Sequence, residues 1–309
     1  MPMLDQNKPR VLVLMASYNG LQYIDTQIKS ITDQVDCEIR LLISVDKSDD
    51  NTFYHLQDLK KNDEFIELLA YGAKYGSAAA NFYRLIIEAN LQGYDFISFA
   101  DQDDIWEQDK LIRHIKLMQE HGVDGVSSSV LAFWANGKKK IINKSQPQRE
   151  LDFLFESAGP GCSFLMTPWL VNKVREQLTD KNSLAKDIVL HDWLTYAICR
   201  AHGRRWVIDS NPSVKYRQHE NNVLGANTGF KAKFSRLQKL SQGWYRNEVI
   251  KIAQVCNRIY PNIETEKLSS LLVTKNLYSQ LKLLAYVTKA RRSLLDRCLL
   301  ALSITVGIF

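Results

Sequence analysis

Short apolar runs alternate with helical patterns over the first 110 residues of the chain. Each run is long enough for one buried strand, and the segments between the runs carry apolar residues at helical spacing. We predict strands over Val11–Met15, Ile39–Val45, Phe65–Ala70 and Phe96–Ala100, and helices over Tyr23–Thr32, Asn51–Lys60 and Ala78–Glu88. This alternation predicts an α/β fold with a mainly parallel central sheet that is covered by helices.

The middle of the chain is less regular. We predict one strand over Gly125–Trp134, a turn or solvated loop at Lys138–Lys140, and a tight turn at Gly159–Gly161 before the apolar Cys162–Met166. Further elements are then expected, namely helices over Pro168–Leu178 and His191–Arg200 and a strand over Arg205–Ile208.

Polar residues stand directly after three of the predicted strands. They are Ser17-Tyr18-Asn19, Asp46 and the acidic turn Asp101-Gln102-Asp103-Asp104. Ligands of parallel sheets bind beyond the carboxyl ends of the strands, so these residues are candidates for a binding site. Asp46 could accept the N3–H of a uracil or thymine ring. Tyr18 could stack on that ring or serve instead as a buried aromatic anchor.

Three carboxylates within four residues repel one another unless a cation offsets their charge. The acidic turn therefore favours a site for Mg²⁺ or Mn²⁺, which bind hard oxygen ligands together with phosphate oxygens. The alternative is a solvated acidic turn that caps the next helix. A neutral His219 could complete the metal site with Asp103, although a lone histidine in a polar loop is more often a surface residue.

His191-Asp192-Trp193 stands at the start of a predicted helix. Asp192 could act as a general base that accepts a proton from an acceptor hydroxyl group. Alternatively, His191 or Asp192 caps the helix, which is the usual role of Asp at that place.

Composition excludes several classes of protein. Hydrophobic residues make up 45% and charged residues 24% of the 309 residues, which excludes a disordered chain, a collagen and a multi-span membrane protein. The five cysteines are scattered without a Cys-x-x-Cys pair, which favours reduced, buried thiols in a cytosol. No signal peptide is expected, because the first apolar run, Val11–Ala16, has only six residues.

From Phe230 onward the pattern is purely helical, and the charge changes as well. We place one domain boundary here, between residues 1–230 and residues 231–309. The second region carries 14 Lys and Arg against four acidic residues, a net charge of +10, whereas the first carries −4. This asymmetry indicates an anionic partner for the C-terminal region.

Six motifs in one order carry a resemblance to a known family. They are MASYNG, ISVDKSDDNT, FADQDDIW followed by KL, GPGC, HDW and YRQHENNVLGA. Over about residues 9–226 the chain resembles the inverting family 2 glycosyltransferases with a GT-A fold. Among these it is most similar to bacterial rhamnosyltransferases that build cell-surface polysaccharide.

The resemblance implies a nucleotide-sugar donor, with dTDP-L-rhamnose expected, and Mg²⁺ or Mn²⁺ as the cofactor. The nucleotide sugar would be held by Ser17, Tyr18, Asn19, Asp46, Asp101, Gln102 and Arg217. The divalent ion would be bound by Asp101, Asp103 and His219. Asp192 would be the catalytic base.

The last twelve residues, Cys298–Phe309, are uncharged and strongly apolar, and four cations precede or flank them: Lys289, Arg291, Arg292 and Arg297. Spanning a bilayer takes about 20 residues. The segment suits an interfacial helix on an anionic leaflet, or else a helix packed on the catalytic domain or in a homodimer. The first alternative predicts a cytoplasmic enzyme, peripheral at the inner face of the plasma membrane, with a glycan or polyprenyl-linked acceptor.

Other functions fit the pattern less well. A nucleotide-sugar pyrophosphorylase needs a Gly-rich basic loop after the first strand, and a Rossmann dehydrogenase needs G-x-G-x-x-G there. The alternatives that remain are a transferase of the same fold with a UDP-linked hexose and a non-catalytic membrane or nucleic-acid adaptor. We expect no nucleic-acid partner, because aromatic residues and cations are barely combined in the tail, at Trp244-Tyr245-Arg246.

Overall fold

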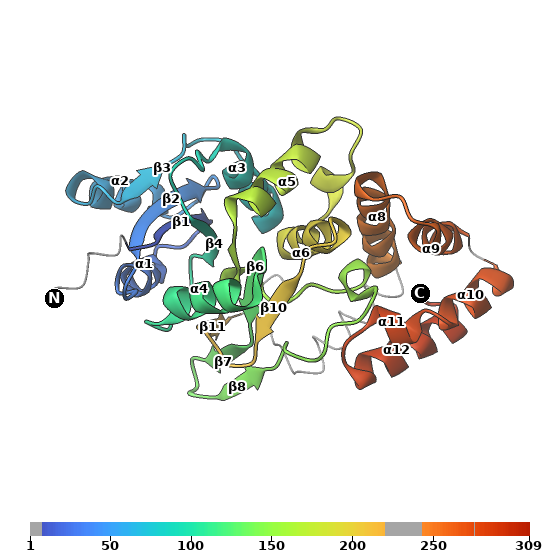
Figure 1. Cartoon of the computed structure of the whole chain (residues 1–309). Helices are drawn as coiled ribbons and strands as arrows, with labels where there is room; N and C mark the ends of the chain where they lie inside the picture. The colour runs from blue at the N-terminus through green and yellow to red at the C-terminus, as the bar shows by residue number, and fades with distance from the viewer. Residues whose placement is uncertain (1–7, 220–242, 275) are drawn as a thin grey trace.

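The computed structural model describes residues 8–219, 243–274 and 276–309 (Figure 1). Two β-sheets and their covering helices are built from the chain up to residue 219, and helices alone follow from residue 243. The boundary predicted near residue 230 lies outside the described residues.

The larger sheet has seven strands and is parallel except for one short strand. In spatial order the strands are β10 (Trp206–Asp209), β6 (Gly125–Ser128), β9 (Leu165–Met166), β4 (Phe96–Asp101), β1 (Arg10–Ser17), β2 (Glu38–Val45) and β3 (Ile66–Leu68). Strand β9 runs antiparallel to both of its neighbours, β4 and β6. The predicted α/β fold with a mainly parallel sheet is confirmed.

Helices cover both faces of this sheet. They are α1 (Ile24–Thr32), α2 (Thr52–Asn62), α3 (Ala78–Glu88), α4 (Lys110–His121), α5 (Pro168–Thr179) and α6 (His191–Ala201). Alternate residues of β1 belong to two different apolar clusters, one on each face of the sheet. Val11 and Val13 pack in one cluster with α1, α2 and α4, whereas Leu12 and Leu14 pack in another with α3, α5 and α6. Side chains of a strand point to opposite faces in turn, so a strand covered on both sides is apolar throughout.

A second sheet of four strands adjoins the carboxyl end of β4. Its order is β5 (Ile105–Trp106), β11 (Val214–Gln218), β7 (Val130–Trp134) and β8 (Lys139–Ile142). The prediction of one strand over Gly125–Trp134 is wrong, because the chain passes at Ser129 from β6 in the first sheet to β7 in the second. The predicted turn at Lys138–Lys140 is also wrong from Lys139 onward. There the chain forms an edge strand, where lysines are common because they discourage pairing with other chains.

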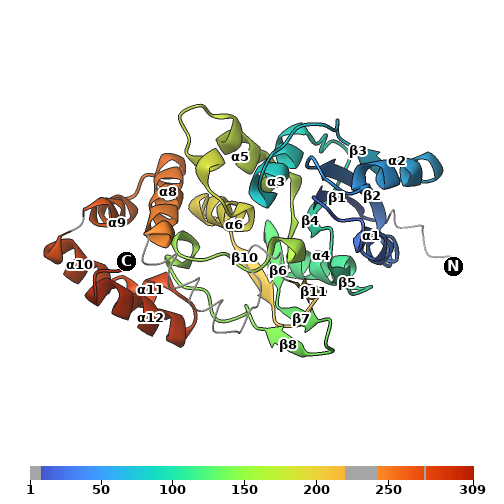
Figure 2. The same ribbon diagram turned by 180° about the vertical axis from the view of Figure 1, so that it is seen from behind.

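The C-terminal region is helical, as predicted. Its helices are α8 (Trp244–Ile259), α9 (Ile263–Val273), α10 (Leu277–Leu284), α11 (Val287–Ala290) and α12 (Leu294–Thr305). Helix α8 packs against α6, and Val249 and Ile252 join the same apolar cluster as Leu194 of α6. Figures 1 and 2 show the other C-terminal helices at the end of the molecule opposite α1 and α2.

Within the described ranges, no helix is both long enough and apolar enough to cross a lipid bilayer.

Candidate active site

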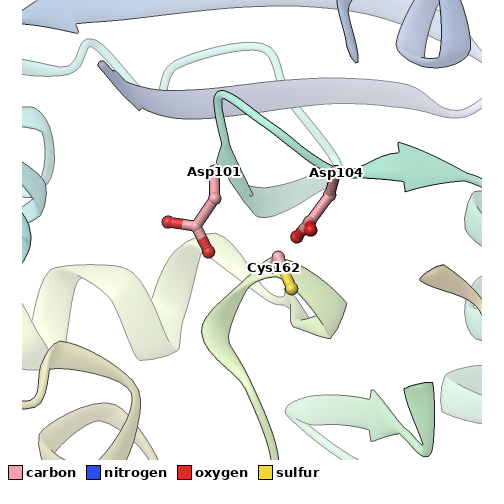
Figure 3. A group of neighbouring side chains, drawn as sticks. All are labelled: Asp101, Asp104 and Cys162. Carbon is pink, nitrogen blue, oxygen red and sulfur yellow. The ribbon is translucent and has the colours of Figure 1, made fainter. Parts of the chain in front are cut away.

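The acidic turn Asp101–Asp104 lies at the carboxyl end of β4, beside the end of β1. Asp101 is the last residue of β4 and is in register with Ala16 of β1. Figure 3 shows the carboxylates of Asp101 and Asp104 directed toward Cys162, in the short 3-10 helix Gly161–Ser163. Asp104 is fully buried, and its Oδ1 accepts a 2.9 Å hydrogen bond from the backbone N–H of Arg217. Asp104 therefore ties the turn to β11 of the second sheet.

Asp101, Asp104 and Cys162 form one group of potential metal ligands, with ligand atoms within 4.8 Å of one another. Burial and the charges of Asp103 and Asp101 raise the pKa of Asp104 well above its usual range. Burial likewise raises the pKa of the Cys162 thiol. Burial disfavours the ionised form of both groups, and Oδ1 of Asp104 is already bonded to the Arg217 N–H, so the contact of Asp104 with Cys162 fits a structural role.

Asp103 and His219 are 116 residues apart in sequence and in direct contact in the structure. The Nε2 atom of His219 lies 2.6 Å from Oδ2 of Asp103. The imidazole ring stacks on Tyr23, with ring centroids 5.8 Å apart. Arg217 of β11 donates from Nε to the backbone carbonyl oxygen of Asp103 at 2.7 Å. Strand β11 thus brings two predicted site residues, Arg217 and His219, to the acidic turn.

Asp101 lies in the field of two other carboxylates. Burial, followed by the charges of Asp103 and Asp192, raises the pKa of Asp101 to about 8. A divalent cation would offset this repulsion. Asp101, Asp103 and His219 supply carboxylate oxygens and one imidazole nitrogen, a donor set whose chemistry suits Mg²⁺ or Mn²⁺, and two of the three, Asp103 and His219, are in direct contact.

Asp192 lies in the first turn of α6. Its Oδ1 accepts a 2.7 Å hydrogen bond from the backbone N–H of Trp193. Burial raises the pKa of Asp192 to about 6, while the Trp193 N–H, the charge of Lys144 and the Ser157 hydroxyl act in the opposite direction. The N-cap of α6 is Leu190, which has no side-chain capping bond, so neither His191 nor Asp192 occupies the N-cap position.

His191 is held between aromatic rings behind Asp192. Its ring stacks on Phe82 with centroids 3.9 Å apart and meets Phe99 edge-on. Burial lowers the pKa of His191 to about 3, so the imidazole is neutral. Gly161 approaches it closely, because a Cβ atom at Gly161 would lie 2.4 Å from His191 Nε2.

Gln102 joins the acidic turn to the end of β1. Its Oε1 accepts hydrogen bonds from the Ser17 hydroxyl at 2.7 Å and from the Tyr18 N–H at 2.6 Å. Its Nε2 donates to the Tyr18 carbonyl oxygen at 2.6 Å. A Cβ atom at Gly20 would lie 2.3 Å from Gln102 Oε1, so a larger residue there would displace the Gln102 amide from these hydrogen bonds. The Tyr18 side chain remains 49% exposed, which leaves its ring accessible and excludes the buried-anchor alternative.

Asp46 and Asn19 hold the loops around the same strand ends. Asp46 Oδ1 accepts from the N–H of Tyr75 at 2.7 Å, and Oδ2 accepts from Gly76 at 2.8 Å. Asn19 has a positive φ of 48°, and its Oδ1 accepts from the N–H of Asp49 at 2.8 Å. The backbone N–H of Asp46 donates to the Ser17 carbonyl oxygen at 2.8 Å, which connects the two loops.

Comparison with known proteins identifies the family. The family model described as glycosyl transferase family 2 matches residues 12–166, which include most of β1, all of β4 and the acidic turn. The chain belongs to glycosyltransferase family 2. It is therefore an enzyme, a glycosyltransferase, and not a non-catalytic adaptor.

Individual relatives agree with this assignment. The glycosyltransferase is 37% identical to the dTDP-rhamnosyl transferase RfbG of Shigella flexneri, over 96% of this chain and 100% of the relative. TarS 1-349 of S. aureus in complex with UDP-GlcNAc superposes with a TM-score of 0.59 at 13% identity, over 97% of this chain and 82% of that chain. The mannosyltransferase PcManGT of Pyrobaculum calidifontis, in complex with GDP-Man and Mn2+, gives a TM-score of 0.53 at 15% identity, over 98% and 82%. The expected GT-A fold is confirmed.

The site of this glycosyltransferase contains residues that the sequence pattern did not identify. Tyr75 and Gly76 bind the Asp46 carboxylate through their backbone, so no side-chain signal marks them. Lys144 and Ser157 influence Asp192 from loops without periodicity. The Gly-Pro-Gly-Cys motif was the available signal for Gly161 and Cys162, because repeated glycines indicate a close backbone approach.

Proposed function

We propose that this glycosyltransferase transfers L-rhamnose from dTDP-L-rhamnose to a hydroxyl group of a lipid-linked or polysaccharide acceptor, with inversion at the anomeric carbon and a divalent metal ion. The proposal depends on the contact of Asp103 with His219 and on Asp101, whose pKa is raised by the charges of both Asp103 and Asp192. The name of the full-length relative, a dTDP-rhamnosyl transferase, supports the choice of donor.

The ends of β1 and β2 offer contacts for the nucleotide. The exposed ring of Tyr18 is accessible for stacking on the base. Oδ2 of Asp46 accepts one hydrogen bond among the described residues, from Gly76, so it keeps a lone pair for the N3–H of thymine. Arg217 adds a positive charge beside the acidic turn, where the diphosphate would lie.

Asp192 is the base in this proposal. Its carboxylate takes the proton of the acceptor hydroxyl, the hydroxyl oxygen bonds to the anomeric carbon, and the bond from that carbon to dTDP breaks. Asp101, Asp103 and His219 would hold a Mg²⁺ or Mn²⁺ ion, and a bound ion would supply positive charge for the departing diphosphate. A β-linked donor would give an α-rhamnoside.

The variant Asp192→Asn tests the base. We expect transfer to fall by about 10²- to 10⁴-fold, the usual contribution of a general base, while the affinity for dTDP-L-rhamnose is unchanged. Initial rates and isothermal titration measure the two quantities. Turnover at the wild-type rate would refute the role of Asp192.

A panel of nucleotide sugars tests the donor. Binding of dTDP-L-rhamnose, UDP-glucose and UDP-GlcNAc is compared with and without Mn²⁺. We expect the tightest metal-dependent binding for dTDP-L-rhamnose. Tighter binding of a UDP-linked hexose would assign the enzyme to the alternative donor while leaving the catalytic residues as proposed.

We also propose that α10 and α12 place the enzyme on an anionic membrane surface. The two helices pack against each other, and many of the apolar residues on them and at the end of α12 are exposed. These residues, here called the apolar face, are Leu277, Tyr278, Leu281, Leu294, Leu295, Leu299, Leu302 and Val306. The net charge of +10 over residues 231–309 favours an anionic leaflet over a second copy of the same cationic region.

Three of the four cations that the sequence places beside this face form ion pairs within the protein. Arg292 is buried and paired with Asp152, and Arg291 is paired with Asp296, so the structure does not present them to lipid. Lys289 forms ion pairs with Glu150 and Glu264. An exposed lysine, Lys282 of α10, lies beside the apolar face, with its Nζ 4.4 Å from the Tyr278 ring centroid.

A further inference from the structure

Arg292 connects the C-terminal helices to the segment Asp152–Ser157. It lies between α11 and α12 with only 3% of its surface exposed. Its Nη1 donates to Asp152 Oδ2 at 3.1 Å, and its Nη2 donates to the Ser157 carbonyl oxygen at 2.5 Å. Its backbone N–H donates to Glu156 Oε1 at 2.6 Å. A buried guanidinium is tolerated here because its charge is paired with Asp152 and Glu156 and both of its terminal nitrogens donate hydrogen bonds.

Other residues of the C-terminal region hold the same segment. The Tyr245 hydroxyl of α8 donates to the Phe155 carbonyl oxygen at 2.6 Å, and Arg291 Nη1 donates to that oxygen at 3.0 Å. Phe155, Glu156 and Ser157 are thus each bonded to a residue from the C-terminal region. These three residues are here called the tethered turn.

The tethered turn interacts with Asp192 through the side chain of Ser157. The Ser157 hydroxyl donates to the Gly159 carbonyl oxygen at 2.8 Å, and it is also one of the groups that lower the pKa of the Asp192 carboxyl. A hydroxyl has one proton, so it can donate to either acceptor and stabilises the ionised carboxylate when it turns to Asp192.

Arg292 also reaches the helix that carries Asp192. The Asp152 carboxylate is fully buried and accepts from the Tyr196 hydroxyl at 3.0 Å and from Arg200 Nη1 at 3.2 Å. Tyr196 and Arg200 belong to α6, which begins at His191. One residue of the C-terminal region, Arg292, therefore contacts the tethered turn directly and, through Asp152, the helix that carries Asp192.

We infer that Arg292 is a positioning residue for Asp192, which it acts on through the tethered turn and the Ser157 hydroxyl. The C-terminal region is then part of the acceptor side of the active site. This inference rests on the proposed role of Asp192 as the base.

Several groups face Asp192 and bear on its titration. They are Lys144 from the loop after β8, Asp101 at the end of β4, Tyr83 of α3 and the Ser157 hydroxyl. Lys144 and the hydroxyl favour the ionised carboxylate of Asp192. Removal of the hydroxyl alone leaves the other groups in place.

The pH profile of kcat/KM for the acceptor tests the inference in the full-length enzyme with Mn²⁺ and donor. For Ser157→Ala we expect the acid limb to move to higher pH by about half a unit, which is about threefold slower transfer at low pH. Ser157→Thr keeps the hydroxyl and should restore the wild-type profile. Arg292→Lys keeps the positive charge but removes the two guanidinium nitrogens that donate to Asp152 and Ser157. It should therefore shift the acid limb of the pH profile in the same direction as Ser157→Ala.

Lys289→Met is the matched control, because Lys289 lies in the same region and its side chain pairs with Glu150 and Glu264 rather than with the tethered turn. Its profile should equal that of the wild type, and the donor affinity of all four variants should be unchanged. Wild-type profiles for both Ser157→Ala and Arg292→Lys would overturn the inference. If Asp192→Asn retained turnover, the base assignment itself would fail, which is a separate result.

Discussion

Asp192 has to be ionised to accept a proton, and its burial makes this dependent on pH. Because burial raises the pKa of this carboxyl to about 6, it becomes protonated as the pH falls through that value. We therefore expect kcat/KM to be constant above pH 7 and to fall about tenfold per unit below pH 6. Initial rates at saturating metal and donor measure the profile. Activity that stayed constant down to about pH 4, the ordinary range of Asp, would contradict the assignment.

The acidic turn allows the two neighbouring aspartates to be separated by experiment. Asp103→Asn should weaken Mn²⁺-dependent donor binding by at least about tenfold, because a metal ligand is lost. Asp104→Asn is the control, since an amide Oδ1 at this position can still accept from the Arg217 N–H. Titration of dTDP with and without Mn²⁺ measures both variants. Equal losses in the two would place the ion elsewhere.

At the scale of elements, the 3-10 helix at Gly161 packs against the start of α6. Gly161→Ala would place a Cβ atom 2.4 Å from His191 Nε2 and 3.4 Å from Asp192 Cβ. We expect the unfolding free energy to fall by about 1–3 kcal/mol and transfer to fall with it, because the α6 start must shift.

A second substitution separates this steric effect from a general loss of stability. His191→Ala removes the ring that the new methyl group would meet, so in the double variant the two losses should be less than additive. Thermal unfolding and initial rates on all four proteins complete the cycle. Strict additivity would show that the contact with His191 is not the cause.

The elements that the sequence predicted well are those with a strong apolar pattern. Strands β1, β2 and β4 are buried on both faces, so their composition alone marks them. Strand β5 has only two residues and β8 is an exposed edge strand, so neither has an apolar pattern from which a strand could be predicted. Asp103 and His219 could be predicted as partners because their motifs resemble those of a family, but their contact depends on β11, whose pairing with β7 no local pattern indicates.

In the folded protein, Arg292 is a cation whose role could not be predicted from the net charge of the C-terminal region. A cluster of cations beside an apolar C-terminal segment has the same sequence pattern whether its partners are lipids or buried carboxylates. The partners of Arg292 are Asp152 and Glu156, 140 and 136 residues earlier in the chain. Only the packing of the C-terminal helices on the catalytic part reveals them.

The same packing determines how membrane binding has to be tested. Deletion of the last helix would remove Phe309, which is buried and whose carbonyl oxygen accepts from Arg246, so it would expose the core. The substitution pair Leu295→Glu and Leu299→Glu changes residues that are 68% and 54% exposed, and the fold should be unaffected. Tyr54→Glu on α2 is the control, at an apolar residue that is 61% exposed and far from the apolar face.

Sedimentation with vesicles of phosphatidylglycerol or phosphatidylcholine measures the binding. The wild type and Tyr54→Glu should bind the anionic vesicles preferentially. The double variant should bind at least about tenfold more weakly, since inserting two leucines is worth about 1.5–3 kcal/mol each. Unchanged binding of the double variant would refute the membrane role. A wild-type dimer without vesicles that the double variant abolishes would assign the apolar face to a second copy, because the same leucines cannot face lipid and a partner at once.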